Sequence, residues 1–314
     1  MTATAGYALD LQGHRGARGL KPENTLPAFA HALSLGVTTL ELDCAITKDG
    51  VVVVSHDSTL NPDITRAPDG RWLAGGESPI RQFAYEELQR FDVGRIDPKS
   101  AYAKRFSQQQ PVDGTRMPRL ADVFALARKS GNDAVRFNIE TKISPLHPER
   151  TMAPDNFARA LILLIKKENL ESRATIQSFD WRTLAVVQKE APQIATVYLT
   201  AQQSWQDNIL AKQASSSWTA PLHVSQFGGS VPRMVKAAGG AVWSPYYGEV
   251  TREQVQEAQA LGLKVVMWTV NEPADLRRMI EWRVDGIISD YPDQLRQVAG
   301  EMGLPLPRPT PVTP

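Results

Sequence analysis

The stretch "ITKDGVVVV", Ile46 to Val54, decides how the strands of this 314-residue chain are counted. Its Asp49-Gly50 pair, between two apolar runs, is a strong signal for a two-residue β-hairpin turn. We therefore expect Val51–Ser55 to run back antiparallel to the strand before it, Thr38–Cys44. A strand that returns in this way cannot be a member of an all-parallel barrel.

Outside this hairpin, short apolar runs alternate with amphipathic stretches of helical period almost throughout the chain. Eight of these runs predict barrel strands: Tyr7–Gly13, Thr38–Cys44, Ala134–Ile139, Ala174–Ser178, Ile194–Leu199, Ala241–Ser244, Lys264–Val270 and Gly286–Ser289. Asn24 or Thr25 is the expected N-cap of the first helix. Eight strand–helix units predict one α/β domain over residues 1–314, a (β/α)8 TIM barrel. A doubly wound sheet is the alternative, although it more usually has five or six parallel strands.

The alternation fails between His56 and Met117, where turn-forming residues dominate. About 60 residues without barrel elements is long for a plain loop. We therefore expect residues 58–117 to form a small cap, inserted after the second strand and its hairpin. The end of the chain, "GLPLPRPTPVTP" at residues 303–314, is proline-rich and is expected to be an extended, frayed tail.

The composition excludes several classes of protein. The net charge of +1 offers no general attraction to nucleic acid, so any anion site must be local. The single cysteine, Cys44, excludes an internal disulfide and a cysteine-rich zinc site, and we expect it to be plain core. No apolar run approaches the roughly 20 residues of a membrane span. We expect a cytoplasmic protein if Met1 is the native start, or a periplasmic one if a signal peptide has been removed. The oligomeric state stays open.

Ionisable residues gather where four consecutive strands end, which is the catalytic face of a TIM barrel. The first strand ends in Gly13-His14-Arg15, and the hairpin ends in His56-Asp57. Glu41 and Asp43 are two residues apart on the second strand and therefore point to the same face. By the same alternation, Glu140 and Lys142 point together at the end of the next parallel strand.

Three carboxylates in one barrel mouth would repel one another unless a cation or a proton joined them. Oxygen ligands without cysteine favour one hard divalent cation, Mg²⁺ or Ca²⁺. Two histidines, an arginine and a lysine surround this cluster, so the positive charges can stabilise phosphate oxygens while one imidazole takes a proton and the other gives one. The pattern therefore predicts cleavage of a phosphoryl ester.

The sequence of residues 13–60, "GHRGARGLKPENTLPAFAHALSLGVTTLELDCAITKDGVVVVSHDSTL", resembles the N-terminal signature of the glycerophosphodiester phosphodiesterase family. That signature is HRG, PENT, a helix, E-x-D, T-x-DG and HD, in this order. The later stretches "NIETK", "IQSFD", "VVMWTVNEP" and "DGIISDYPD" look like further blocks of the family, so the resemblance spans roughly Leu11 to Gln294.

The resemblance implies a metal-dependent hydrolase that converts a small glycerophosphodiester to sn-glycerol 3-phosphate and an alcohol. It implies that Glu41, Asp43 and Glu140 bind the ion, that His14 and His56 form the acid–base pair, and that Arg15 contacts the phosphate with Lys142 beside it. We favour His14 as the group that activates the attacking oxygen and His56 as the acid, although the sequence does not orient the pair.

The leaving-group side is less well defined by the sequence. The family often shows R-T-T/S-x-G after HD, whereas this chain has "NPDITRAPDGRWLAGG", in which Arg66 and Gly70 are the candidate remnants. Phe179 and Trp268 are the predicted pocket aromatics, and Trp243 is assigned to barrel packing. The remaining histidines, His31, His147 and His223, are expected to be structural or exposed.

Three other functions fit parts of the pattern. A phosphodiester lyase or phospholipase D-like enzyme of the same barrel type would give a cyclic phosphate. A barrel without catalysis would only bind phosphoesters or metal. A metal-dependent sugar isomerase ranks last, because it usually needs no His-Arg loop after its first strand.

Overall fold

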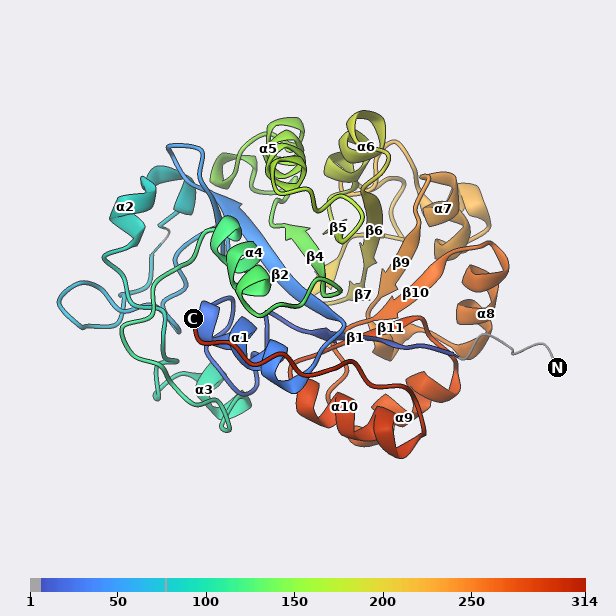
Figure 1. Cartoon of the computed structure of the whole chain (residues 1–314). Coiled ribbons are helices and arrows are strands. Elements are labelled where there is room, and N and C mark those ends of the chain that lie inside the picture. Colours follow the sequence, from blue (N-terminus) through green and yellow to red (C-terminus); the bar gives the residue numbers. More distant parts are fainter. Residues whose placement is uncertain (1–6, 77) are drawn as a thin grey trace.

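The computed structural model describes residues 7–76 and 78–314. In these ranges, eight parallel strands close into a barrel in the order β1-β2-β4-β5-β6-β9-β10-β11, with β11 pairing back to β1 (Figure 1). The barrel strands are β1 (Asp10–Gly13), β2 (Thr39–Ile46), β4 (Arg136–Thr141), β5 (Ala174–Ser178), β6 (Ala195–Thr200), β9 (Val242–Pro245), β10 (Lys264–Met267) and β11 (Gly286–Ser289). The predicted (β/α)8 TIM barrel is confirmed, and the doubly wound alternative is wrong.

The predicted hairpin, which excludes Val51–Ser55 from the parallel strands of the barrel, is also confirmed. Strand β3 (Val52–Val54) pairs antiparallel with the end of β2, in register Cys44 with Val54 and Ile46 with Val52. Strand β2 is therefore longer than predicted, because its last residues continue past the neighbouring strand β4 to pair with β3.

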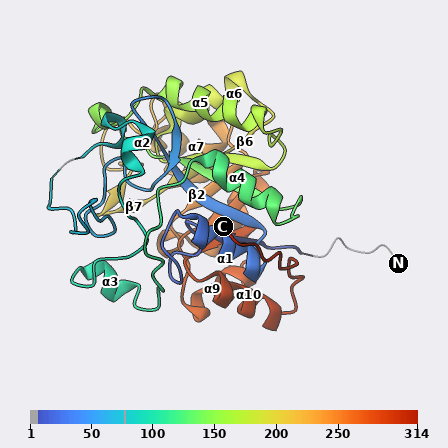
Figure 2. The same ribbon diagram turned by 60° about the vertical axis from the view of Figure 1, so that its left-hand side comes forward.

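Helices enclose the barrel, one after each parallel strand (Figure 2). They are α1 (Leu26–Leu35), α4 (Leu120–Lys129), α5 (Pro154–Lys167), α6 (Trp181–Glu190), α7 (Val231–Ala237), α8 (Arg252–Ala260), α9 (Pro273–Glu281) and α10 (Pro292–Glu301). Short 3-10 turns occur at η1 (Ile80–Gln82), η2 (Pro148–Arg150), η3 (Val224–Phe227) and η4 (Tyr247–Glu249). Thr25 is the N-cap of α1, since its hydroxyl accepts a hydrogen bond from Ala28 N at 3.4 Å.

The two faces of the strands differ in what they pack against. Residues that point outward, such as Leu40, Leu42 and the fully buried Cys44, join the core between the barrel and its helices. Inside the barrel, β6, β9, β10 and β11 contribute an apolar cluster, whose members are Val197, Val242, Val266 and Ile288. The strands β1, β2, β4 and β5 instead carry polar side chains into the interior, and these lead to the site described in the next subsection.

Residues 58–117 lie between β3 and α4 and contain the short helices α2 (Tyr85–Leu88) and α3 (Ala101–Arg105). Figure 1 shows α2 and α3 on the side of the barrel opposite α7 and α8. Leu60, Ile80 and Leu88 form a small separate core with Val53 of the hairpin. The segment is thus packed on the β2–β3 hairpin, beside the barrel.

The C-terminal segment, residues 303–314, is extended as expected, but the expectation that it is frayed is wrong. Thr310 N donates to Leu33 O of α1 at 2.9 Å, and Thr313 O accepts from Lys129 of α4 at 2.9 Å. Prolines keep this backbone extended, so its remaining polar groups can reach the ends of two barrel helices.

In the described part of the chain, no helix is both long enough and apolar enough to cross a membrane. Residues 1–6, which bear on the expectation about a signal peptide, lie outside the described residues.

Two leucines of α5 give a matched test of the core. Leu161 is 0% exposed and Leu163 is 68% exposed on the same helix. Leu161→Ala should lower the free energy of unfolding by about 2–5 kcal/mol, because it leaves a cavity between α5 and the barrel. Leu163→Ala should change it by less than about 0.5 kcal/mol. Urea unfolding followed by circular dichroism measures both, and equal losses would contradict the assigned packing of α5.

Candidate active site

A cavity of about 950 Å³ opens at the C-terminal ends of the barrel strands. The predicted site residues that line it are His14, Arg15, Glu41, His56, Glu140, Lys142, Phe179 and Trp268. The ninth, Asp43, belongs to the same group of carboxylates as Glu41 and Glu140. The structure therefore brings together all nine residues that the sequence singled out.

The three carboxylates are buried and lie close together. One oxygen each of Glu41, Asp43 and Glu140 falls within 4.8 Å of the others, and Asp43 is the direct neighbour of Glu140 across β2 and β4. Burial, and after it the charge of Asp43, holds the pKa of Glu41 well above its usual range, and burial raises the pKa of Glu140 to about 7. A positive ion between them would relieve both effects.

Asp43 carries the clearest sign of a missing partner. In the described part of the chain, its buried Oδ1 has no hydrogen bond, and Lys142 Nζ is 3.9 Å away. A buried acceptor without a donor is costly unless something else binds it. Three clustered carboxylates, one of which has a buried oxygen without a hydrogen bond, fit a hard divalent cation, so this cluster could hold one.

A row of buried side-chain amides inside the barrel holds Glu41 in place through hydrogen bonds. Gln177 Nε2 donates to Glu41 Oε1 at 2.6 Å. Asn138 Nδ2 in turn donates to Gln177 Oε1 at 2.9 Å and to Gln12 Oε1 at 3.0 Å. The other oxygen of Glu41 accepts from the backbone N–H of Arg15 at 2.8 Å. Both oxygens are thereby fixed in direction by hydrogen bonds.

The Gly-His-Arg-Gly turn brings a guanidinium to the carboxylates. Arg15 has a φ of 49° and Gly16 a φ of 85°, in the left-handed region that favours glycine. A Cβ on Gly16 would lie 2.8 Å from the carbonyl carbon of Ala28, so only glycine permits this approach to α1. The turn places Arg15 Nε 3.4 Å from Asp43 Oδ2.

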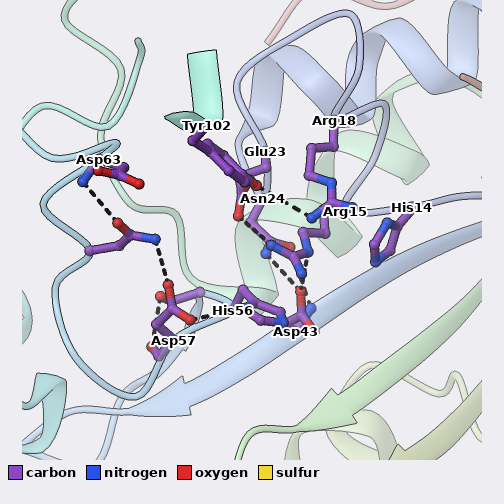
Figure 3. A network of polar contacts seen from close by, with 12 residues as sticks. His14, Arg15, Arg18, Glu23, Asn24, Asp43, His56, Asp57, Asp63 and Tyr102 are labelled. Carbon is purple, nitrogen blue, oxygen red and sulfur yellow. Dashed lines mark hydrogen bonds and ion pairs between the residues drawn. The ribbon is translucent and has the colours of Figure 1, made fainter. Parts of the chain in front are cut away.

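Behind Arg15 lies a second layer of polar contacts, which Figure 3 shows from close by. Arg15 donates to Glu23 Oε1 at 2.6 Å, and Tyr102 of α3 donates to the other oxygen of Glu23. Asn24 Nδ2 donates to Asp43 Oδ2 at 2.9 Å. The "PENT" residues thus orient Arg15 and Asp43, and Tyr102 joins residues 58–117 to this network.

His14 is oriented by a buried acid that directly follows the last strand, β11. Its Nδ1 lies 2.6 Å from Asp290 Oδ1, while its Nε2 lies 3.9 Å from Glu41 Oε2. Asp290 also accepts from Arg18 at 2.7 and 3.0 Å and from Asn271 at 2.8 Å. Burial, and after it the charge of Arg18, lowers the pKa of His14 to about 4. An imidazole in this setting is neutral near pH 7.

His56 is less enclosed and has a different partner. Its Nδ1 lies 2.9 Å from Asp57 Oδ1, and Asn61 donates to the other oxygen of Asp57 at 2.8 Å. Burial, followed by the charges of Arg15 and Lys142, lowers the pKa of His56. Figure 3 shows His14 and His56 on opposite sides of Asp43.

Lys142 contacts Phe179, and Phe179 contacts Trp268, so the lysine and the two predicted pocket aromatics follow one another along one side of the cavity. Lys142 donates to Glu140 Oε1 at 2.8 Å, and its Nζ lies 6.0 Å from the centre of the Phe179 ring. The Phe179 and Trp268 rings meet edge to face at 5.4 Å. Trp243 is buried in the core, as expected, and donates to Thr200 Oγ1 at 2.9 Å.

The other residues raised by the sequence contribute little to the site. Arg66 bonds to Asp92 and Asp113 within residues 58–117, and neither it nor Gly70 is among the described residues that line the cavity. His147 lies at the exposed rim of the cavity, whereas His31 and His223 are not among those lining residues.

Three comparisons relate the chain to known proteins. The model of the Glycerophosphoryl diester phosphodiesterase family matches residues 14–294. The chain belongs to this family. A glycerophosphodiester phosphodiesterase of Caldanaerobacter subterraneus subsp. tengcongensis is 30% identical over 90% of this chain and 94% of its own length.

Solved structures of the family agree with the fold. A candidate glycerophosphoryl diester phosphodiesterase from Silicibacter pomeroyi has a TM-score of 0.84 and 36% identity, over 95% of each chain. A phosphodiesterase from Oleispira antarctica, in complex with the product sn-glycerol-3-phosphate, has a TM-score of 0.67 and 21% identity, over 94% of this chain and 98% of that one. At 21% identity, the similarity to the Oleispira antarctica protein shows the fold alone.

Several residues around the family site were not found from the sequence. Asp290 directly follows β11, so the strand-end rule that selected His14 and Glu41 would also have selected it. Gln177 points inward on β5 and was detectable by alternation. Tyr102 lies in a stretch without periodic pattern, and its contact with Glu23 gives no sequence signal.

If the carboxylate cluster binds a metal ion, loss of one carboxylate should lower the affinity of the protein for that ion. Asp43→Asn should weaken binding of Mg²⁺ and Ca²⁺ at least about 10-fold, because removing even an outer partner of a metal ligand costs roughly that much. Titration calorimetry with each ion measures this. Asp122→Asn, on the first turn of α4 and bonded to Arg119, is the matched control. Equal affinities in both variants would remove Asp43 from the ligand set.

Proposed function

We propose that this protein hydrolyses glycerophosphodiesters to sn-glycerol 3-phosphate and an alcohol, with the help of one divalent cation. The observation that carries the proposal is a cluster of buried carboxylates in one cavity with two imidazoles, each of which is bonded through Nδ1 to a further carboxylate. Membership of the family supports it, as does the 30% identity to the glycerophosphodiester phosphodiesterase of Caldanaerobacter subterraneus subsp. tengcongensis.

Glu41, Asp43 and Glu140 would hold the cation, for which Mg²⁺ and Ca²⁺ are the candidates that suit an all-carboxylate set. When bound, the ion supplies a positive charge that stabilises the phosphate oxygens as the ester bond breaks. Arg15 and Lys142 line the same cavity and would add two further positive charges to the bound phosphate.

His14 has the surroundings of a general base. The Nδ1–H of His14 donates a hydrogen bond to Asp290, which leaves the lone pair of Nε2 directed toward Glu41 and the cavity. Because Arg18 already neutralises Asp290, this acid orients the ring without holding it protonated. We therefore assign His14 to the attacking oxygen, with Asp290 as its positioning residue.

His56 has the surroundings of the acid. Its carboxylate partner, Asp57, is bonded to an amide rather than to a guanidinium, so more of its negative charge is left to stabilise an imidazolium. A substrate phosphate would add further negative charge beside it. We assign His56 to protonation of the departing alkoxide.

We further propose that residues 58–117 act as a cap that supports the phosphate side of the site within one domain. Among the described residues of this segment, Ser58, Thr59 and Arg105 line the cavity. Its other contribution is the bond from Tyr102 to Glu23, which holds Arg15 in place.

Metal dependence and reaction type are tested together. After removal of metal with a chelator, release of sn-glycerol 3-phosphate from glycerophosphocholine and glycerophosphoglycerol should vanish and should return with Mg²⁺ or Ca²⁺. A ³¹P spectrum should contain the phosphomonoester alone. A cyclic phosphate as the final product would instead identify a lyase or phospholipase D-like reaction, and no product with either ion would leave a barrel that only binds.

The roles of the two histidines are separable by the leaving group. His14→Ala and His56→Ala should each lower kcat on glycerophosphocholine by about 10²–10⁴. The 4-nitrophenyl ester of glycerol 3-phosphate releases an anion that needs no proton, so His56→Ala should keep most of the wild-type rate on it while His14→Ala stays slow. The opposite pattern would exchange the two roles.

Asp290→Asn tests the positioning residue. It should lower kcat with little change in KM, because the imidazole of His14 would turn or change tautomer while the substrate contacts remain. Thr39→Val, which removes a buried side-chain hydrogen bond to Asp10 where β1 and β2 begin, controls for general disturbance of the barrel. A fall in stability without a fall in kcat would mean that Asp290 is only structural.

A further inference from the structure

Aromatic rings line the cavity from the loops after β5, β6, β9 and β10, whereas the two histidines follow β1 and β3. Phe179 follows β5, Tyr246 and Tyr247 follow β9, and Trp268 follows β10. Trp205 lies in the turn of a small hairpin, β7 (Gln202–Gln203) and β8 (Gln206–Asp207), between β6 and α7. We call these five residues the aromatic wall. Neighbouring rings lie 5.2–6.0 Å apart, so the wall is continuous.

Charge is divided between the two halves of the cavity. All of its lysines and arginines come from residues 14–150, which include Arg15, Arg18 and Lys142. Among the described lining residues from Gln177 to Ile288, no side chain is cationic, and Glu272 is acidic. Lys142 lies beside Phe179, where the wall meets the phosphate side. Beyond Phe179, an anionic alcohol group would find no counter-charge among the described lining residues, whereas a cationic one would find ring faces.

The wall begins close to the phosphate side. Lys142 Nζ is 6.0 Å from the ring centre of Phe179, Phe179 is 5.4 Å from Trp268, and Trp268 is 6.0 Å from Trp205. A group joined to the phosphate by a short linker would reach these rings without leaving the cavity.

The exposed Trp205 is held in place from both ends of its hairpin. Glu249 accepts from Gln202 N and from Gln203 Nε2, both at 2.9 Å. At the other end, Asn208 accepts from Ala201 N and donates to Phe179 O, both at 3.0 Å. Trp205 is nonetheless 59% exposed. A large apolar ring fixed in solvent at a cavity mouth marks a binding surface rather than core.

We propose that the aromatic wall binds a quaternary ammonium alcohol as the leaving group of the diester, and that Trp205 is a specificity-determining residue for it. A methylated ammonium suits this surface, because it is attracted to ring faces and needs no hydrogen-bond partner. The inference rests on the proposed function, since it names the alcohol that the same site releases.

The test compares three esters of sn-glycerol 3-phosphate with the metal-loaded protein. They are the choline ester, its uncharged carbon isostere the 3,3-dimethylbutyl ester, and the glycerol ester. Wild type should have a kcat/KM for the choline ester about 10-fold above that for the isostere, which is the size of one cation–π contact. Equal values for choline and the isostere would show an apolar pocket and overturn the proposal.

Variants of the hairpin then test Trp205 itself. Trp205→Ala and Trp205→Leu should each lower the ratio of kcat/KM for the choline ester to that for the glycerol ester about 10-fold, while Trp205→Phe should restore most of it. Trp282→Ala, at the end of α9 and outside the cavity, is the matched control and should leave the ratio unchanged. A Trp205→Leu ratio equal to that of wild type would overturn the role of the ring face.

Binding without turnover separates this proposal from the proposed function. Choline alone should change the tryptophan fluorescence saturably in wild type and in Trp282→Ala, but not in Trp205→Ala. That result, combined with no hydrolysis of any ester, would contradict the proposed function and keep the aromatic site. The absence of a saturable change in wild type would overturn the site whether or not the esters are hydrolysed.

Discussion

Three carboxylates buried within 4.8 Å of one another at the barrel mouth are the constraint around which the surrounding polar groups are arranged. In a low-dielectric site they repel one another unless positive charge is supplied. Arg15 and Lys142 supply part of it, and Asn24 and Gln177 donate hydrogen bonds that fix the oxygens. A divalent cation would supply the remainder. The glycine turn after β1 follows from the same need, because it lets a buried guanidinium approach a buried acid.

The barrel separates two kinds of chemistry that the reaction needs. Strands β1, β2 and β4, with the residues that follow them, carry Arg15, Lys142 and the three clustered carboxylates, whereas the loops after β5, β9 and β10 carry rings. The interior repeats this division, with amides such as Asn138 on one side and valines such as Val197 on the other. A phosphodiester has a charged centre and a variable alcohol, so a cavity with a fixed polar half and a separate aromatic half suits such a substrate.

Much of this arrangement follows from the sequence by two simple rules. The Asp49-Gly50 turn removes one strand from the count and leaves a barrel, and strand ends then select His14, Glu41, Asp43 and Glu140. The same rule applied to the last strand would have found Asp290. Tyr102 and Trp205 were beyond it, because each acts from an irregular segment whose contacts depend on packing between residues far apart in the sequence. The expectation that residues 303–314 are frayed was wrong for a similar reason, because this segment bonds to Leu33 and Lys129, which lie far away in the sequence.

The measurement that tests the account most directly is anomalous diffraction from crystals of the protein soaked in Mn²⁺, which takes the same oxygen ligands as Mg²⁺. We expect a strong peak among Glu41, Asp43 and Glu140, with carboxylate oxygens at coordinating distance and Asp43 Oδ1 as one of them. Saturated crystals with no peak there, or with the ion bound only elsewhere on the barrel, would contradict it.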